Sequence, residues 1–401
     1  MTIAQHFATR TNRMKASEIR ELLKLLDRPG ILSFAGGIPD ADLFPAEAFA
    51  KACAEILAES PGAALQYSVS EGYPPLRAWI ANHMTGLGIP CGPDNILITS
   101  GSQQALDYLG KLFLSPGDTA LVGWPTYLGA LGAFNAYEPR YDRLDLTANR
   151  SAEFIRATAE AAGSTVKFAY LSPDFANPTG ETLDAAHRNR LLDMAQDLDC
   201  AIIEDTAYQA LRYEGEDIPP VLALELARTG NLDACRTIYC GSFSKTLSPG
   251  LRVGWVVAAQ PIIKQLVLLK QAADLHSPSL NQMAVHRVAE SCFDTHLPTV
   301  RAAYRTRRDA MLDALQQHMP PGVSWTRPQG GMFIWLTLPQ GSSATRLLAR
   351  AIETFDLAFV PGRAFFADGS QDNTLRLSFS CATPAEIQTG MERLAQALKT
   401  L

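Results

Sequence analysis

The sequence lacks any long run of apolar residues, although 47% of its 401 residues are hydrophobic. A membrane-spanning helix needs about 20 consecutive apolar residues, and a secretory signal needs a compact apolar segment near its start. The first thirty residues of this chain are mixed and charged instead. We therefore expect neither a membrane span nor a signal peptide.

The chain also lacks an excess of positive charge. Its 35 Lys and Arg residues are outnumbered by 41 Asp and Glu residues, which gives a net charge of −6. Proteins that bind nucleic acids or anionic membrane surfaces use a surplus of basic side chains. The sequence predicts no partner of either kind.

Paired cysteines and clustered histidines are missing as well. The seven cysteines include no Cys-x-x-Cys pair, and the seven histidines include no His-Glu-x-x-His motif. Zinc sites use spacings of this kind, so no metal is expected. Several cysteines lie inside apolar runs, which is typical of buried free thiols and predicts a cytoplasmic location.

Short apolar runs alternate with segments of helical periodicity through the middle of the chain. Five runs are predicted as strands, at residues 96–99, 119–122, 166–171, 201–203 and 237–240. Such runs, separated by helices, indicate an α/β fold with a mostly parallel sheet covered on both faces. Ligands bind outside the carboxyl ends of such strands, and each of these runs ends in a polar cluster.

The remainder of the chain differs from this pattern. Residues 280–318 look helical, whereas 331–336 and 375–379 alternate like strands of a smaller α+β unit. The predicted organisation is an N-terminal segment, 1–60, that packs with the small domain, a large domain, 61–290, and a small C-terminal domain, 291–401.

Lys245 is the most informative residue. It lies in the segment Ser242-Phe243-Ser244-Lys245-Thr246-Leu247-Ser248-Pro249-Gly250-Leu251-Arg252-Val253-Gly254. Its amine can capture a carbonyl, while the hydroxyls of Ser242 and Ser244 and the Arg252 guanidinium can hold a phosphate. A solvated loop lysine is the alternative. A nucleotide P-loop is excluded, because the positions that require glycine hold Ser244 and Tyr239.

Carbonyl capture and phosphate binding coincide in pyridoxal 5′-phosphate (PLP), an aldehyde that carries a phosphate. Lys245 would hold this aldehyde as a Schiff base and later move the substrate's α-proton. Asp205 would pair with the pyridine nitrogen and keep it protonated, so that the ring acts as an electron sink. A helix cap is the alternative role for an Asp at a strand end.

Further polar clusters supply the other functions. Gly101-Ser102-Gln103 offers a turn, a hydroxyl and backbone N–H groups at a helix start, which suits a phosphate as well as a simple cap. Asn177 and Tyr208 are candidates to hydrogen-bond the 3′ oxygen of the cofactor, although Asn-Pro-Thr-Gly is also a good turn. Tyr127 is a candidate to stack on the ring, although such an aromatic is more often part of the core. Arg376 is the candidate for the α-carboxylate of an amino acid, unless it forms a surface salt bridge.

Together these motifs resemble the PLP-dependent aminotransferases of fold type I, class I/II, over essentially the whole chain. The likeness is greatest to the 2-aminoadipate, kynurenine and broad-specificity aromatic branch. It rests on Ser33-Phe34-Ala35-Gly36-Gly37-Ile38-Pro39, Leu65-Gln66-Tyr67-Ser68-Val69-Ser70-Glu71-Gly72, Ser100-Gly101-Ser102-Gln103-Gln104, Asn177-Pro178-Thr179-Gly180, the Lys245 segment and the Arg376 strand. The resemblance implies a seven-stranded, mostly parallel sheet between helices, and a smaller α+β domain.

The resemblance also implies roles beyond those argued from the residues. It implies a homodimer with shared active sites, in which Tyr67 reaches the phosphate of the neighbouring subunit's cofactor. It places Gly37 and Ile38 near the substrate, and Arg20 in an N-terminal segment that covers the site. Where relatives commonly have Asp-Asp-Pro-Tyr, this chain has Asp205-Thr206-Ala207-Tyr208, a departure that bears on substrate preference rather than on the chemistry.

The predicted function is therefore that of an aminotransferase with a ping-pong cycle. The donor would be an aromatic, branched-chain or 2-aminoadipate-like L-amino acid, and the acceptor a 2-oxo acid such as 2-oxoglutarate. A PLP lyase or racemase on the same scaffold is the nearest alternative, because a fold alone does not decide function. A PLP-binding regulatory module is the more distant one.

Overall fold

The computed structural model describes residues 3–14, 30–147 and 150–400. Seven strands form one sheet in the order β2-β8-β7-β6-β5-β3-β4. Their bounds are β2 (Ile96–Thr99), β3 (Thr119–Val122), β4 (Arg140–Arg143), β5 (Val166–Leu171), β6 (Ala201–Asp205), β7 (Thr237–Ser242) and β8 (Gly254–Val257). Only β8 is antiparallel to its neighbours. The predicted mostly parallel sheet is confirmed, and it includes all five predicted strands.

Both faces of this sheet are covered by helices, as the apolar strands require. In β5, Phe168 and Tyr170 belong to a cluster with α5, α6 and α10, whereas Ala169 and Leu171 pack with α8 on the opposite face. Side chains alternate between the faces of a strand, so a strand that is buried on both faces is mostly apolar. The helices are α4 (Pro74–Gly86), α5 (Ser102–Phe113), α6 (Leu128–Asn135), α7 (Ala152–Ala161), α8 (Ala185–Leu198), α9 (Val221–Thr229) and α10 (Gln260–Ala273).

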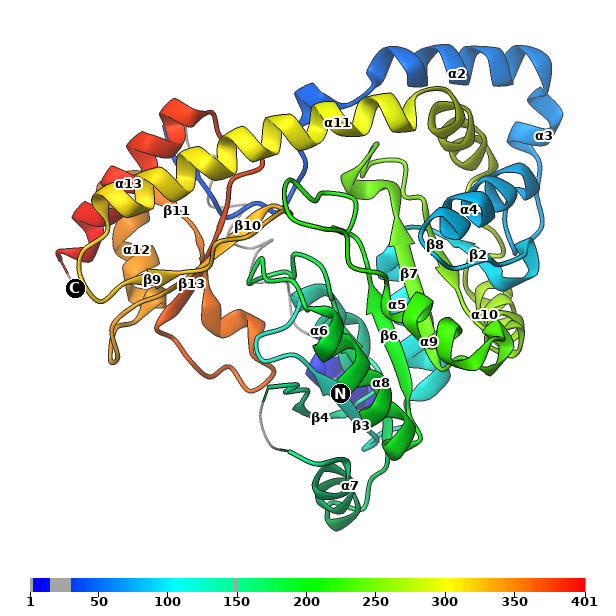
Figure 1. Cartoon of the computed structure of the whole chain (residues 1–401), viewed down its shortest axis with the longest axis horizontal. Helices are drawn as coiled ribbons and strands as arrows, with labels where there is room; N and C mark the ends of the chain where they lie inside the picture. Colours follow the sequence, from blue (N-terminus) through cyan, green and yellow to red (C-terminus); the bar gives the residue numbers. More distant parts are fainter. Residues whose placement is uncertain (1–2, 15–29, 148–149, 401) are drawn as a thin grey trace.

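A second, antiparallel sheet has the order β12-β13-β10-β9 and lies at the left of Figure 1 with two helices. Its elements are β9 (Ser324–Trp325), β10 (Phe333–Thr337), α12 (Ala344–Phe355), β12 (Val360–Pro361), β13 (Thr374–Ser378) and α13 (Pro384–Leu398). Nearby, β1 (Leu32–Ser33) pairs in parallel with β11 (Leu357–Ala358). The chain near residue 32 is thereby attached to the C-terminal part.

One long helix, α11 (Ser279–His318), passes along both sheet regions (Figure 1). It packs against α2 (Ala46–Glu59), α3 (Pro61–Leu65) and α4 at one end and α13 at the other. The predicted helix at 280–318 is thus observed. The predicted domain boundary between residues 290 and 291 falls inside this helix, and the division into domains stays a prediction.

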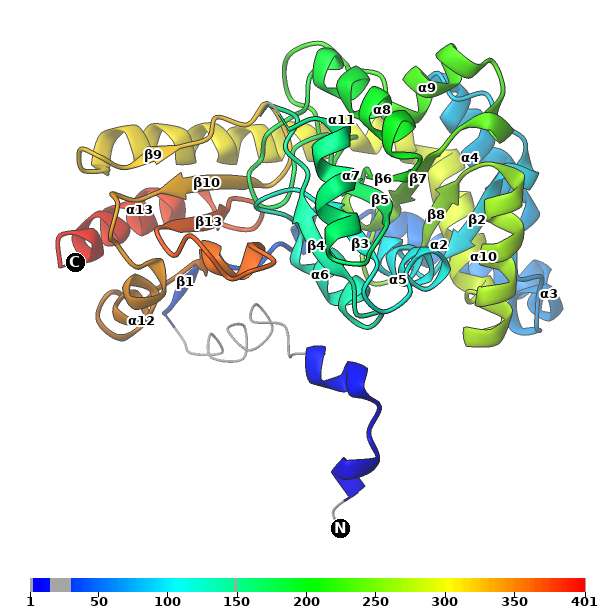
Figure 2. The ribbon, with the colours of Figure 1, turned by 90° about the horizontal axis from the view of Figure 1, so that it is seen from below.

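The N-terminal residues 3–14 lie apart from the main body in Figure 2. They form two short 3-10 helices, Ile3–His6 and Thr9–Arg13. Arg13 Nη2 donates a 2.8 Å hydrogen bond to the Pro139 carbonyl of the large sheet region.

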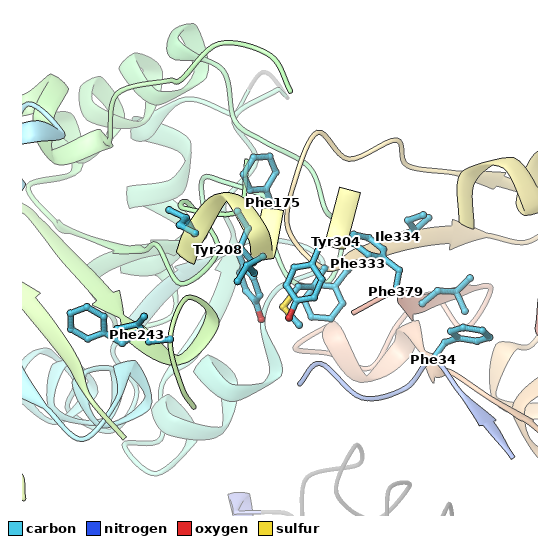
Figure 3. Packing of buried hydrophobic residues seen from close by; sticks show 14 of the residues in the cluster. Phe34, Phe175, Tyr208, Phe243, Tyr304, Phe333, Ile334 and Phe379 are labelled. Carbon is cyan, nitrogen blue, oxygen red and sulfur yellow. The ribbon is translucent and has the colours of Figure 1, made fainter. Parts of the chain in front are cut away.

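A buried apolar cluster joins the two sheet regions. Figure 3 shows Tyr208 on one side of this junction and Phe333 on the other, and their ring centroids are 5.5 Å apart. Within the described residues, no helix is both long and apolar enough to cross a membrane. The same residues contain no group of three or more His, Cys, Asp or Glu side chains that could hold a metal ion.

Candidate active site

The polar residues predicted to act together follow three neighbouring strands of the large sheet. Asn177 follows β5, Asp205 ends β6, and Lys245 ends a 3-10 turn, Phe243–Lys245, that directly follows β7. These strands are adjacent and parallel, so their carboxyl ends share one edge of the sheet. The topology therefore places these side chains at the edge where α/β proteins bind ligands.

Lys245 faces the junction between the two sheet regions. Its Nζ donates a 2.9 Å hydrogen bond to the Gly37 carbonyl and lies 5.7 Å from the ring centroid of Tyr208. Burial lowers the pKa of Lys245 to about 8, and the positive charges of Arg376 and Arg252 act in the same direction. A fraction of the amine is therefore neutral near pH 7, as a nucleophile requires.

Asp205 is a buried carboxylate with few partners. Its Oδ2 accepts a 2.9 Å hydrogen bond from the Tyr170 hydroxyl, and its Oδ1 accepts a long one, 3.4 Å, from the Ala207 N–H. Burial raises the pKa of Asp205 to about 6, while the bond from Tyr170 opposes this shift. A positively charged N–H donor beside this carboxylate would offset the desolvation.

Arg376 is a buried cation on β13, only 1% exposed. Nη1 donates to Asn177 Oδ1 at 2.8 Å and Nη2 donates to the Ala35 carbonyl at 2.7 Å, whereas Nε has no partner among the described residues. The guanidinium lies 4.3 Å from the ring centroid of Phe333. Burial lowers the pKa of Arg376 to about 10. A buried guanidinium with only neutral partners is suited to binding a carboxylate.

The segment that contains Gly37 passes close to Arg376. A Cβ atom at Gly37 would lie 3.0 Å from Phe333 Cζ and 3.6 Å from Arg376 Nη2, so the absent side chain leaves space beside the guanidinium. Ile38 is 59% exposed, and its carbonyl accepts a 2.6 Å hydrogen bond from Ser380 Oγ. Arg20, the predicted covering residue, lies outside the described residues.

A second polar group surrounds the start of α5. The helix begins at Ser102 directly after Gly101, whose φ is +80°. A Cβ atom at Gly101 would overlap with Arg252 Nη2, so the guanidinium lies directly against the Gly101 backbone. Ser242 Oγ accepts a 3.1 Å hydrogen bond from the Ser244 N–H and lies 2.9 Å from Ser244 Oγ. The Arg252 guanidinium, the hydroxyls of Ser242 and Ser244, and the N-terminus of α5 together form a candidate anion-binding site.

The three remaining predicted residues are Gln103, Tyr127 and Tyr67. Gln103 is exposed and donates a 2.7 Å hydrogen bond to the Gly129 carbonyl. Tyr127 is the N-cap of α6, and it lies close enough to Tyr208 to raise the pKa of that phenol, whose burial is the larger cause. Tyr67 is 78% exposed, and its ring contacts the His276 ring edge-on, with 5.9 Å between the ring centroids.

The donor set fits PLP. Lys245 would supply an amine for the aldehyde, Asp205 a buried carboxylate for the ring nitrogen, and Arg252 with the start of α5 an anion site for the phosphate. The glycine at position 101 supports this fit, since the guanidinium of Arg252 already occupies the volume of a Cβ.

The comparisons with known proteins agree with this geometry. A family model described as Aminotransferase class I and II matches residues 29–394. The chain belongs to this family. The aminotransferase is 47% identical to a 2-aminoadipate transaminase of Thermus thermophilus, over 99% of this chain and 98% of the relative. It is 40% identical to an aromatic-amino-acid aminotransferase of Thermococcus litoralis, over 98% of this chain and 94% of the relative.

Solved structures give the same result. The crystal structure of alpha-aminoadipate aminotransferase from Thermus thermophilus, complexed with N-(5′-phosphopyridoxyl)-L-leucine, matches this aminotransferase with a TM-score of 0.88 at 43% identity. The match covers 100% of this chain and 99% of the other. The predictions of a fold type I aminotransferase and of PLP as its cofactor are confirmed.

The arrangement can carry out amino-group transfer. When bound, PLP supplies an aldehyde for the amine and a ring that withdraws electrons. The amine of Lys245, when it is neutral, can take a proton from a substrate carbon and return it. Asp205 can hold a proton on the ring nitrogen by its negative charge, and Arg376 can orient the substrate through its carboxylate.

Sequence reasoning missed the partners that orient these groups. Tyr170 donates to Asp205 from the neighbouring strand β5, 35 residues away, and the Ala35 carbonyl accepts from Arg376, 341 residues away. Tyr170 lies in the run 166–171, whose sequence predicts a buried strand and nothing more specific. Strand order alone could have suggested it, because β5 and β6 are neighbours in the sheet.

Proposed function

We propose that this aminotransferase transfers the amino group of an L-α-amino acid to 2-oxoglutarate in a ping-pong cycle. The donor has an aromatic, branched-chain or 2-aminoadipate-like side chain. The observation that carries the proposal is the buried Arg376 guanidinium, which lies beside Gly37 while the Lys245 amine donates to the Gly37 carbonyl. An α-amino acid held by its carboxylate at Arg376 would present its α-carbon to the amine of Lys245.

The donor class is supported by the surroundings of Arg376 and by the relatives. Phe333 and Phe365 flank the guanidinium at 4.3 and 5.1 Å from their ring centroids, which makes an apolar environment for a side chain. The relatives named above are a 2-aminoadipate transaminase and an aromatic-amino-acid aminotransferase. A site that accepts both kinds of side chain fits the proposal.

We assign the following roles to the individual residues. Lys245 is the catalytic amine, and Asp205 and Tyr208 act on the cofactor ring and its oxygen, with Asn177 between Tyr208 and Arg376. The phosphate is held by Ser102, Gln103, Ser242, Ser244 and Arg252, and Tyr127 stacks on the ring. We place Arg376, Asn177, Gly37 and Ile38 beside the substrate. Arg20 lies outside the described residues, and its contact with the substrate stays a prediction.

A homodimer is part of the proposal. Leu65, Tyr67 and Val69 are 71%, 78% and 51% exposed, and the Tyr67 ring contacts His276 beside Leu275, which is 44% exposed. Large exposed apolar side chains gathered in this way are typical of subunit interfaces. We place Tyr67 of each subunit at the phosphate of the other.

A cytoplasmic location is proposed from the cysteines. All seven lie in the described part of the chain and are free, and Cys381 is exposed. Free thiols persist where the compartment is reducing.

The test of the proposed function is a two-step assay on the purified holoenzyme. Each donor is added first without an acceptor, and the absorbance should shift to that of the amine form of the cofactor. Addition of 2-oxoglutarate should restore the original spectrum and produce glutamate. Release of ammonia, or racemisation of the donor without a spectral cycle, would instead establish the lyase or racemase reaction.

A further inference from the structure

A fully buried lysine lies outside the residues considered so far. Lys270 on α10 is 0% exposed, and its Nζ donates to Ser277 Oγ at 2.9 Å, to Gln104 Oε1 at 3.2 Å and to Asp274 Oδ1 at 3.2 Å. These three acceptors match the three N–H groups of an ammonium. Lysine is rarely buried so completely without such partners, so the ammonium is held in one place.

One arm of this network leads through Gln104 to the start of α5. Gln104 Oε1 also accepts a 2.8 Å hydrogen bond from the Ser100 N–H, and Gln104 Nε2 donates to Asp274 Oδ2 at 2.6 Å. Lys270 can only donate, so it forces the Gln104 amide to turn its oxygen toward Lys270 and Ser100. Ser100 directly precedes the Gly101–Ser102 turn.

A second arm leads through Ser277. Its hydroxyl lies 3.1 Å from Ser100 Oγ, so Ser100 is fixed at both its backbone N–H and its side chain by groups that Lys270 holds. The Ser277 carbonyl accepts a 2.8 Å hydrogen bond from Gln282 Nε2, and Gln282 Oε1 accepts one of 2.7 Å from the Tyr73 N–H. The network therefore continues toward the segment that contains Tyr67.

We propose that Lys270 is a positioning residue for the phosphate of PLP. It fixes Ser100 through Gln104 and Ser277, and so sets the backbone turn from which α5 presents its N–H groups. Lys270 acts through Ser100 and not on the cofactor itself, because its amine donates to Gln104, Asp274 and Ser277. The inference rests on the proposed phosphate site at the start of α5.

The network is specific to the phosphate end of the site. The hydrogen-bonded partners of Lys270 are Gln104, Asp274 and Ser277, whereas Lys245 and Asp205 have other partners. Loss of Lys270 should therefore weaken the binding of the phosphate group and leave the capture of the aldehyde by Lys245 intact. The two effects can be separated with pyridoxal, which has the aldehyde and lacks the phosphate.

The experiment measures binding of PLP and of pyridoxal to the cofactor-free protein by absorbance and by quenching of tryptophan fluorescence. The test variant is Lys270→Met, which keeps the length of the side chain and removes the charge and donors. Lys264→Met, at an exposed position of the same helix, is the matched control. We expect Lys270→Met to weaken PLP binding by about tenfold or more and to leave pyridoxal binding unchanged.

Equal weakening of both ligands, or no weakening of either, would overturn the inference. Gln104→Met is the second variant, for use if Lys270→Met does not fold. Gln104 is less buried than Lys270, and its replacement breaks the same connection to Ser100, so this variant should show the same selective loss of PLP binding. If the unmutated protein itself binds PLP no more tightly than pyridoxal, the proposed phosphate site is wrong, and this outcome is distinct from a failure of Lys270 alone.

Discussion

Arg376 Nη1 donates a 2.8 Å hydrogen bond to Asn177 Oδ1, which lies 199 positions earlier in the chain. Arg376 belongs to the small antiparallel sheet, and Asn177 to the loop after β5 of the large sheet. The bond therefore joins the two sheet regions at the proposed substrate position. It also fixes the guanidinium plane, because Nη2 is held at the same time by the Ala35 carbonyl.

The first prediction concerns the carboxylate at Arg376. Arg376→Leu should lower kcat/KM for L-amino acids by about 10²–10³-fold, because a buried charge pair with the substrate is lost. Arg376→Lys, which keeps the charge without the planar fork, should recover only part of this loss. The half-reaction with a primary amine that lacks a carboxylate is the control and should change little. An equal loss for the amine would show that Arg376 acts on the cofactor instead.

The second prediction concerns the pKa of Lys245, which is about 8 in the cofactor-free protein. The positive charge of Arg376 contributes to this lowering, so Arg376→Leu should raise the pKa of Lys245. The neutral amine captures the aldehyde, so the rate of PLP uptake should rise with pH through about 8. In the variant this rise should occur at higher pH. An unchanged profile would mean that the two charges do not interact.

The third prediction compares two adjacent glycines. Gly37→Ala should raise KM for amino acids, because the new Cβ would lie 3.0 Å from Phe333 Cζ and 3.6 Å from Arg376 Nη2. Gly36→Ala is the matched control, since its Cβ would meet only Ile38 Cγ1 at 3.7 Å, an ordinary contact. Steady-state kinetics of both variants check this, and equal effects would contradict a substrate role for position 37.

The fourth prediction concerns covalent attachment of the cofactor. Lys245→Ala should abolish turnover and the long-wavelength absorbance of bound PLP, because it removes the amine that lies beside Gly37 and Tyr208. Its phosphate site should remain, so the variant should still bind PLP reversibly. Spectroscopy and equilibrium dialysis check both parts. Retained transamination would exclude Lys245 as the catalytic amine.

Much of the fold could be predicted from the sequence, because the large sheet is built from strands buried on both faces. The runs at 96–99, 119–122 and 166–171 are apolar except for Thr99, Thr119 and Lys167, and they became β2, β3 and β5 with the same bounds. The carboxyl ends of these strands then predicted where the polar residues meet. The small strands were harder to predict, because Val360–Pro361 and Ser324–Trp325 are only two residues long.

The contacts that orient the site could not be predicted in the same way. Tyr170, the Ala35 carbonyl and Lys270 act through partners that are distant in sequence or belong to another element. Lys270 lies in a helix whose sequence gives no reason to expect a buried charge, and only the folded positions of Gln104, Asp274 and Ser277 reveal it. Such hydrogen-bond networks depend on how helices and strands pack against each other, and local sequence patterns do not predict this packing.

The last prediction concerns Asp205 and the stability of the cofactor-free protein. Burial raises the pKa of Asp205 from 3.8 to about 6, so the folded protein binds the proton more tightly than the unfolded chain does. Keeping the buried carboxylate charged therefore lowers the free energy of unfolding. This cost is fully present above pH 6 and disappears as the pH falls from 6 to below 4. Asp205→Asn should remove this cost while keeping an acceptor for the Tyr170 hydroxyl.

We expect cofactor-free Asp205→Asn to have a free energy of unfolding about 1–3 kcal/mol higher than that of the unmutated protein at pH 8, with the difference shrinking between pH 6 and 4. Urea unfolding at several pH values checks this, and Asp313→Asn, at an exposed position of α11, is the control. The same substitution should lower transamination strongly, because the neutral amide cannot hold a proton on the ring nitrogen. A gain in stability with a loss of activity would show that Asp205 is retained for the cofactor and not for the fold. A difference in stability that is constant with pH would instead assign the effect to packing.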